Sequence, residues 1–263
     1  MIRLAVTKFL NTYPLIWDLE KSNYKDIELI KEAPARCSSL LLKDKVDGGF
    51  VPVSTFAYRQ DLLVLLNPCV SSNNTVRTVK LYSNKEIDKI YEVIVDEDSR
   101  ASVILLKILL TIKYRKHKLT FFKSNVSEVE NINDEFGYLV IGDKNFRLVK
   151  DFKYQYDLAS EWIEWVNLPF IFALWMLVDN KENRKMGALI KSSYIKAKRN
   201  MDKVCEEASD YWDIPLEEIR SYFKENINFE VSLSGIKAMK LYFQMAYELK
   251  ILPKVGEINF IDV

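Results

Sequence analysis

Four consecutive residues from Ser99 to Ser102 combine two hydroxyls and a guanidinium where a strand is expected to turn into a helix. They follow the apolar run Glu92 to Val95 and precede a strongly apolar helical stretch. The first amides of a helix bind anions because the helix dipole is positive there. We expect Ser99 to be the N-cap, and Ser102 with the amides of Ala101 and Ser102 to receive a carboxylate. The alternative is that Ser99 only caps the helix and Arg100 is a solvated charge.

Asn11 is a second candidate, because it comes directly after the apolar run Ile2 to Val6. Its side-chain amide can both donate and accept hydrogen bonds, which suits a hydroxyl or carboxylate ligand. The alternative is a turn-forming asparagine ahead of Pro14.

Further polar or small residues are found at other strand ends. Gly142 and Asp143 follow the apolar run Tyr138 to Ile141, and glycine permits a ligand to approach the backbone closely. Thr75 and Thr78 lie near the start of another expected strand. Ligands of open α/β sheets bind at such strand ends, so these groups are expected to share one cleft.

Several kinds of catalytic centre are excluded. His117 is the only histidine and lies in a lysine-rich run, so no Ser-His-Asp triad, Cys-His pair or histidine-based metal site can form. Cys37, Cys69 and Cys205 are widely spaced, and we interpret them as small core residues in a reducing compartment. No glycine-rich nucleotide motif is present, so neither a cofactor nor a metal is expected.

Composition limits the partners. The 263 residues include 38 Lys plus Arg and 37 Asp plus Glu, so no overall field favours nucleic acid or a membrane surface. The longest apolar run, Leu168 to Val178, is shorter than the roughly 20 residues of a membrane helix. The N-terminus is typical of a short strand and not of a signal peptide. We expect a cytoplasmic monomer or homodimer that binds a small molecule.

Short apolar runs alternate with helical patterns, which indicates an α/β fold with crossover helices. The expected strands are Ile2 to Val6, Ile27 to Ile30, Gly48 to Val53, Val76 to Tyr82, Glu92 to Val95, Leu119 to Phe122 and Tyr138 to Ile141. The expected helices are Pro34 to Leu42, Ser102 to Tyr114, Glu182 to Ser209, Pro215 to Asn226 and Ser234 to Leu249.

Candidate hinges lie at residues 83–86 and 166–169. If the chain crosses between two lobes there, the middle of the sequence forms one lobe and the two ends form the other. We therefore expect lobe 1 to comprise residues 1–83 plus 176–263 and lobe 2 residues 84–175, with the ligand cleft between them.

The sequence resembles the chorismate dehydratase family of the futalosine route to menaquinone. Matching segments run nearly from end to end in a consistent order. They are Phe9 to Leu15, Ala33 to Ala35, Leu40 to Leu42, Val46 to Val53, Val76 to Val79, Tyr82 to Ser83, Ser99 to Ser102, Leu139 to Asp143, Tyr156 to Leu158, Glu161 to Trp162 and Leu168 to Trp175.

The resemblance implies the two-lobed, periplasmic-binding-protein-like (type II) fold, with two α/β lobes joined by a two-strand hinge. It also implies dehydration of the dicarboxylate chorismate to 3-[(1-carboxyvinyl)oxy]benzoate without a cofactor, with Asn11 as the catalytic residue. The substrate-binding residues would be Thr12, Pro52, Ser54, Thr75, Thr78, Ser99, Arg100, Ala101, Ser102, Gly142 and Asp143.

Three positions depart from the family pattern: Ala101 replaces a threonine, Thr78 replaces a serine, and Val166-Asn167 replaces Thr-Gly. Two other functions remain open. A cytosolic carboxylate-binding or sensor protein would use the same helix-end site and release its ligand unchanged. The related dihydroxynaphthoate synthase is expected to use a histidine in its cleft, and His117 lies in the wrong kind of segment for that role.

Overall fold

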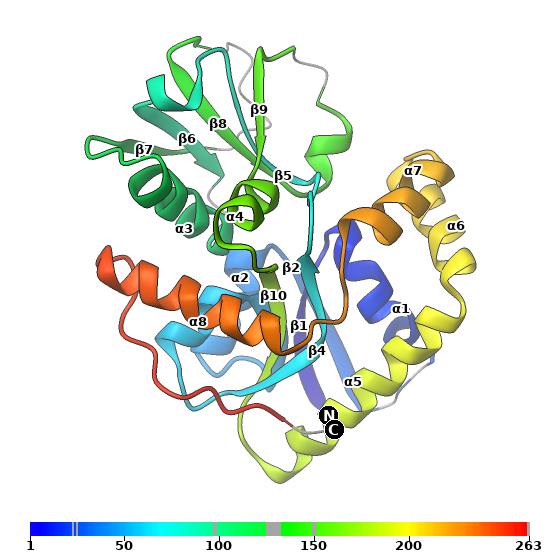
Figure 1. Ribbon diagram of the computed structural model, residues 1–263. Coiled ribbons are helices and arrows are strands. Elements are labelled where there is room, and N and C mark those ends of the chain that lie inside the picture. The colour runs from blue at the N-terminus through cyan, green and yellow to red at the C-terminus, as the bar shows by residue number, and fades with distance from the viewer. Residues whose placement is uncertain (23, 25, 97–98, 125–132, 149–150, 262–263) are drawn as a thin grey trace.

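The computed structural model describes residues 1–22, 24, 26–96, 99–124, 133–148 and 151–261, whose strands form two five-stranded sheets (Figure 1). The first sheet has the order β2-β1-β3-β10-β4. Its strands are β1 Ile2–Thr7, β2 Ile27–Glu32, β3 Gly48–Pro52, β4 Leu63–Ser72 and β10 Phe170–Leu177. The second sheet has the order β7-β6-β8-β5-β9. Its strands are β5 Val79–Ser83, β6 Glu92–Asp96, β7 Thr120–Ser124, β8 Phe136–Ile141 and β9 Tyr154–Asp157.

Helices surround both sheets, and Figure 1 shows the two sheets as separate lobes, with both termini at the far end of the first. The helices are α1 Tyr13–Lys21, α2 Pro34–Leu42, α3 Ala101–Ile108, α4 Leu158–Val166, α5 Lys181–Arg199, α6 Met201–Trp212, α7 Leu216–Ser221 and α8 Leu233–Glu248. A π-helical turn extends α3 over Leu109–Lys113 and another extends α7 over Tyr222–Asn226. In the described part of the chain, no helix is both long and apolar enough to cross a membrane.

The lobe boundaries differ from those expected at 83/84 and 175/176. Strand β5 pairs with β8 and β9 in the second sheet, while β10 pairs with β3 and β4 in the first. The chain therefore leaves the first sheet after Ser72 and returns to it at Phe170. An interior strand covered on both faces is apolar throughout, which explains why β10 shows no alternation in the sequence.

The expected helix from Glu182 to Ser209 is interrupted. Helix α5 ends at Arg199, and the Asn200 side chain donates a hydrogen bond to the carbonyl of Lys196 in its last turn. An asparagine that bonds a helix-end carbonyl favours a stop, so α6 begins as a separate helix at Met201.

Candidate functional site

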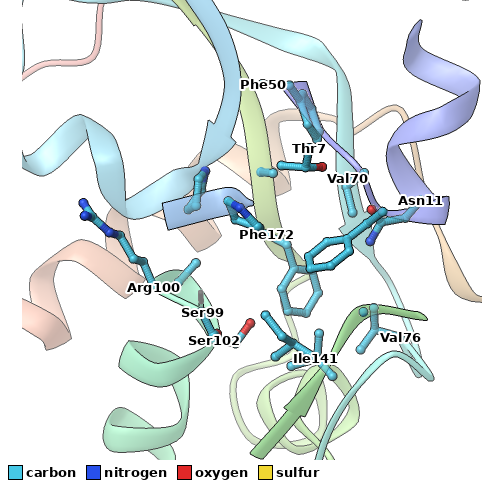
Figure 2. Close-up of a pocket in the computed structure, with 17 residues that line it drawn as sticks. Thr7, Asn11, Phe50, Val70, Val76, Ser99, Arg100, Ser102, Ile141 and Phe172 are labelled. Carbon is cyan, nitrogen blue, oxygen red and sulfur yellow. The ribbon is translucent and has the colours of Figure 1, made fainter. Parts of the chain in front are cut away.

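A cavity of about 570 Å³, counted to its open mouth, lies between the two lobes (Figure 2). From the first lobe it is lined by Thr7, Phe9, Asn11, Pro34, Phe50, Pro52, Val70, Phe172 and Ala173. From the second lobe it is lined by Val76, Val79, Ser99, Arg100, Ala101, Ser102, Ile141 and Gly142. The carboxyl ends of β1, β3 and β8 meet there, which is the usual position of a ligand site in open α/β sheets.

Ser99 is not the N-cap of α3, contrary to our expectation. The cap position is Arg100, and no side chain caps the helix. Ser99 instead lines the cavity, and its hydroxyl oxygen is buried without a hydrogen-bond partner among the described residues. Leaving a buried hydroxyl unpaired costs about 1–3 kcal/mol, which a ligand acceptor at this point would offset. Glu97 and Asp98 of the same turn lie outside the described residues.

The first turn of α3 faces the cavity through Ala101 and Ser102. Its backbone amides carry the positive end of the helix dipole, so a carboxylate is the ligand group that suits them. The position of the turn is supported from the first lobe, because the Tyr242 hydroxyl on α8 donates to the carbonyl of Ala101 at 3.3 Å.

Arg100 lines the rim of the cavity and links the lobes. Its guanidinium nitrogen Nη1 donates to the Ser38 hydroxyl of α2 at 3.1 Å. The same hydroxyl oxygen accepts from Thr55 at 3.0 Å. Figure 2 shows the guanidinium pointing away from Ser99 and Ser102. In this arrangement Arg100 contacts the opposite lobe, while Ser99 and Ser102 line the cavity.

Asn11 lies across the cavity from this turn, on the short 3-10 turn Leu10–Thr12 after β1. Its Oδ1 accepts a hydrogen bond from the Thr12 hydroxyl at 3.3 Å, and Thr12 in turn bonds Thr7. Figure 2 shows Phe172 in the space between Asn11 and the serines. The cavity therefore has polar groups at two opposite sides and an apolar middle.

Five of the expected substrate-binding residues do not line the cavity: Thr12, Ser54, Thr75, Thr78 and Asp143. Thr12, Ser54 and Thr78 are fully buried. Thr75 donates its hydroxyl to Asp157 at 2.7 Å, and the backbone amides of residues 76 and 77 bond the same carboxylate. These side chains therefore lie outside the lining of the cavity.

Asp143 bonds the opposite lobe. Its carboxylate accepts from the backbone N–H of Leu10 at 3.0 Å and from Nε1 of Trp212 at 2.8 Å. Burial raises the pKa of Asp143 to about 6, and these two donors and the charge of Arg147 oppose that effect. The neighbouring Gly142 has φ +70°, which only glycine adopts readily, and it brings the backbone against Phe9.

The sequence reasoning missed much of the apolar lining, above all Phe50, Val70 and Phe172. Each lies on a strand of the first sheet, but only the sheet order shows which strand faces reach the cavity. It also missed Tyr222 and Trp212, whose contacts with Thr78 and Asp143 cross between segments far apart in the chain.

The histidine and the three cysteines do not line the cavity. His117 lines a surface hollow with Lys116 and is not part of the cavity. All three cysteines are buried, and burial raises the pKa of Cys37 and Cys69 to about 12, so they are thiols at neutral pH. Within the described ranges, no group of three or more His, Cys, Asp or Glu side chains is placed to hold a metal ion.

Solved structures with the same arrangement confirm the predicted two-lobed fold. Protein AF1704 from Archaeoglobus fulgidus superposes with a TM-score of 0.78 at 16% identity, covering 95% of this chain and 98% of that one. The periplasmic aliphatic sulphonate binding protein SsuA from Escherichia coli gives 0.65 at 14% identity, over 98% and 94% of the two chains. The Candida albicans CA3427 product, described as having the generic periplasmic binding protein fold, gives 0.55 at 14% identity, over 100% and 98%.

Sequence comparison identifies the family of the chain, which the fold alone does not. Residues 2–248 match the sequence profile of a family described as menaquinone biosynthesis. The match covers both lobes and therefore every residue that lines the cavity, from Thr7 to Ala173. The chain belongs to the menaquinone biosynthesis family.

Proposed function

We propose that the protein is a chorismate dehydratase, which converts chorismate into 3-[(1-carboxyvinyl)oxy]benzoate and water in the futalosine route to menaquinone. The observation that carries the proposal is that Asn11 and the Ser99 to Ser102 turn line one cavity from opposite lobes in a chain of this family. The resemblance of both segments to those of chorismate dehydratases supports the same reaction.

The cavity suits a small dicarboxylate with a ring. Polar groups line it from both lobes, and apolar side chains line the space between them. The unpaired hydroxyl of Ser99, Ser102 and the first amides of α3 would hold one carboxylate. The apolar middle, with Phe172 and Ile141, would cover the ring.

Dehydration requires loss of a ring proton and of the neighbouring hydroxyl. The electrons of the broken C–H bond form the new ring double bond, the C–O bond breaks, and the departing hydroxide takes up a proton to give water. Aromatisation of the ring favours the products.

None of the polar lining residues is an obvious base at neutral pH, because they are Thr7, Asn11, Ser99, Arg100 and Ser102. In our proposal the enolpyruvyl carboxylate of the substrate takes the ring proton. Asn11 and the hydroxyls of the second lobe orient that carboxylate and the leaving hydroxyl, so that the reacting atoms are held in contact.

Incubation of the purified protein with chorismate, followed by mass spectrometry, tests the proposal. The expected product is enolpyruvylbenzoate, lighter than chorismate by one water. Asn11→Ala should lower kcat by about 10² or more while the protein remains folded. Asn200→Ala, which removes an exposed amide of the first lobe, is the control and should keep wild-type activity. Wild-type turnover by Asn11→Ala would contradict the assignment.

A binding protein without catalysis is the second candidate, because the fold is shared with a sulphonate-binding protein. That function predicts that chorismate, or another small anion, binds and is recovered unchanged. The same incubation therefore separates the two candidates. A dihydroxynaphthoate synthase is disfavoured by the position of His117 outside the cavity.

A further inference from the structure

The short turn that carries Asn11 begins without a cap of its own. The 3-10 turn Leu10–Thr12 leads directly into α1, and the side chain of its N-cap residue, Phe9, makes no capping hydrogen bond. The first N–H groups of a helix have no acceptor within the helix. Leu10 supplies such an N–H group, and the residue is fully buried. A buried donor of this kind needs an acceptor from elsewhere in the fold.

The acceptor comes from the second lobe. Both carboxylate oxygens of Asp143 lie 3.0 Å from the backbone nitrogen of Leu10, although the two residues are 133 positions apart in the sequence. A carboxylate suits this place, because it accepts a free N–H and its charge interacts favourably with the positive end of the helix dipole. Asp143 therefore caps the Asn11 turn from the opposite lobe.

The turn that carries Asp143 is itself held firmly in the second lobe. Asn145 donates from Nδ2 to the carbonyls of Thr78 and Gly142, each at 3.0 Å. Its Oδ1 accepts from the Tyr82 hydroxyl at 2.9 Å. The backbone N–H of Gly142 adds a hydrogen bond to the carbonyl of Thr78 at 2.8 Å. The position of Asp143 is therefore fixed relative to the second sheet.

We infer that Asp143 is a positioning residue, which completes the Asn11 turn only while the two lobes are in contact. Asp143 does not line the cavity and acts through the N–H of Leu10, the residue before Asn11. With the lobes apart, water would solvate both the N–H and the carboxylate, and the turn would lose its cap. Lobe contact and the direction of the Asn11 side chain are thereby coupled. The inference rests on the proposed function for its catalytic consequence.

A double-mutant cycle tests this role at pH 8, where Asp143 is ionised because its pKa is about 6. In Asp143→Asn, either orientation of the amide places its NH₂ group about 3.0 Å from the nitrogen of Leu10, so a donor faces a donor. We expect kcat to fall about 10-fold and KM to change less than about threefold. In an Asn11→Ala background the same change should have no further effect on kcat. Wild-type kcat in Asp143→Asn, or an equal loss in both backgrounds, would overturn the inference.

Two further variants separate capping from other effects of a lost carboxylate. Asp18→Asn is the matched control, because Asp18 is a buried carboxylate of the first lobe that accepts from the hydroxyls of Ser22 and Tyr24 at 2.6 and 2.9 Å. It should leave kcat unchanged. Trp212→Phe removes the other donor to Asp143 but leaves Leu10 its acceptor, so kcat should fall less than in Asp143→Asn. Equal losses in these two variants would show that Asp143 only clamps the lobes, which would also overturn the inference.

A second readout does not depend on activity. The backbone amide proton of Leu10, assigned by NMR in labelled protein, should move upfield in Asp143→Asn and exchange with solvent about 10-fold faster or more. Asp18→Asn should change neither property. An unchanged Leu10 signal in Asp143→Asn would overturn the inference. If wild-type protein leaves chorismate intact, the proposed function fails, while this comparison still decides whether Asp143 caps the turn.

Discussion

Asp143 and Trp212 join the two lobes through a 2.8 Å hydrogen bond from Nε1 of the indole to the carboxylate. The same carboxylate accepts from the backbone of Leu10, the residue before Asn11. Asp143 therefore holds the turn that carries Asn11 against the second lobe. The direct substrate contact that the sequence led us to expect for Asp143 stays a prediction.

The stability of the protein should depend on pH through Asp143. Burial raises the pKa of this carboxyl from 3.8 to about 6. A proton is thus bound more tightly in the folded state, and the group contributes most to stability below pH 3.8. That contribution is lost as the pH rises through about 6, and a shift of about 2 pKa units corresponds to at most about 3 kcal/mol.

Denaturant unfolding of wild type and Asp143→Asn from pH 4 to pH 7 measures this effect. The free energy of unfolding of wild type, relative to the variant, should decline across the range. The amide does not titrate, so the difference isolates Asp143 from the other acids. A difference that is constant or rises with pH would show that the carboxyl is not destabilised in its charged form.

Ser99 should be important for binding and dispensable for stability. Its hydroxyl is buried and unpaired among the described residues, so Ser99→Ala removes a desolvation cost and should not lower the free energy of unfolding. The same change should weaken chorismate binding about 10-fold if the hydroxyl donates to a carboxylate.

Ser193→Ala provides the matched control for Ser99. Its hydroxyl is also buried and unpaired in the described structure, but it lies on α5, away from the cavity. It should keep wild-type stability and wild-type affinity, both measured by calorimetry. Equal affinities for the two variants would remove Ser99 from the site.

Gly142→Ala should destabilise the cavity wall. At φ +70° a side chain costs about 1–2 kcal/mol, and the new Cβ would lie 2.8 Å from the ring of Phe9. Gly256→Ala is the control, because its Cβ would meet only Gln60 at 3.6 Å. Urea unfolding should show the loss in the first variant alone, and a neutral Gly142→Ala would refute this account of the turn.

The sequence reveals the alternation of strands and helices but not the full sheet order. Helix Pro34–Leu42 was predicted at its observed bounds, because a proline begins it and leucines end it. Strand β10 went unassigned, because a strand buried on both faces has the same apolar pattern as a buried helix. Strands β4 and β9 were also missed, and β4 supplies Val70 to the cavity.

The sequence also predicted part of the candidate site. Asn11 and Ser102 follow strands whose ends converge, so their presence in one cavity follows from the α/β pattern. The direction of a side chain does not follow from the pattern, which is why Asp143 was placed in the cleft and Ser99 at the helix cap. Tyr222 lies 144 residues after Thr78 in the sequence, and only the folded chain brings their hydroxyls within 2.8 Å of each other.

The central claim is that one dicarboxylate spans the cavity from Asn11 to the first turn of α3. A crystal structure of Asn11→Ala with chorismate tests it most directly, because the slow variant should retain unreacted substrate. We predict a carboxylate within hydrogen-bonding distance of the Ser99 hydroxyl and the amide of Ser102, with the ring against Phe172. Chorismate bound outside this cavity, or lying with both carboxylates away from α3, would contradict the account.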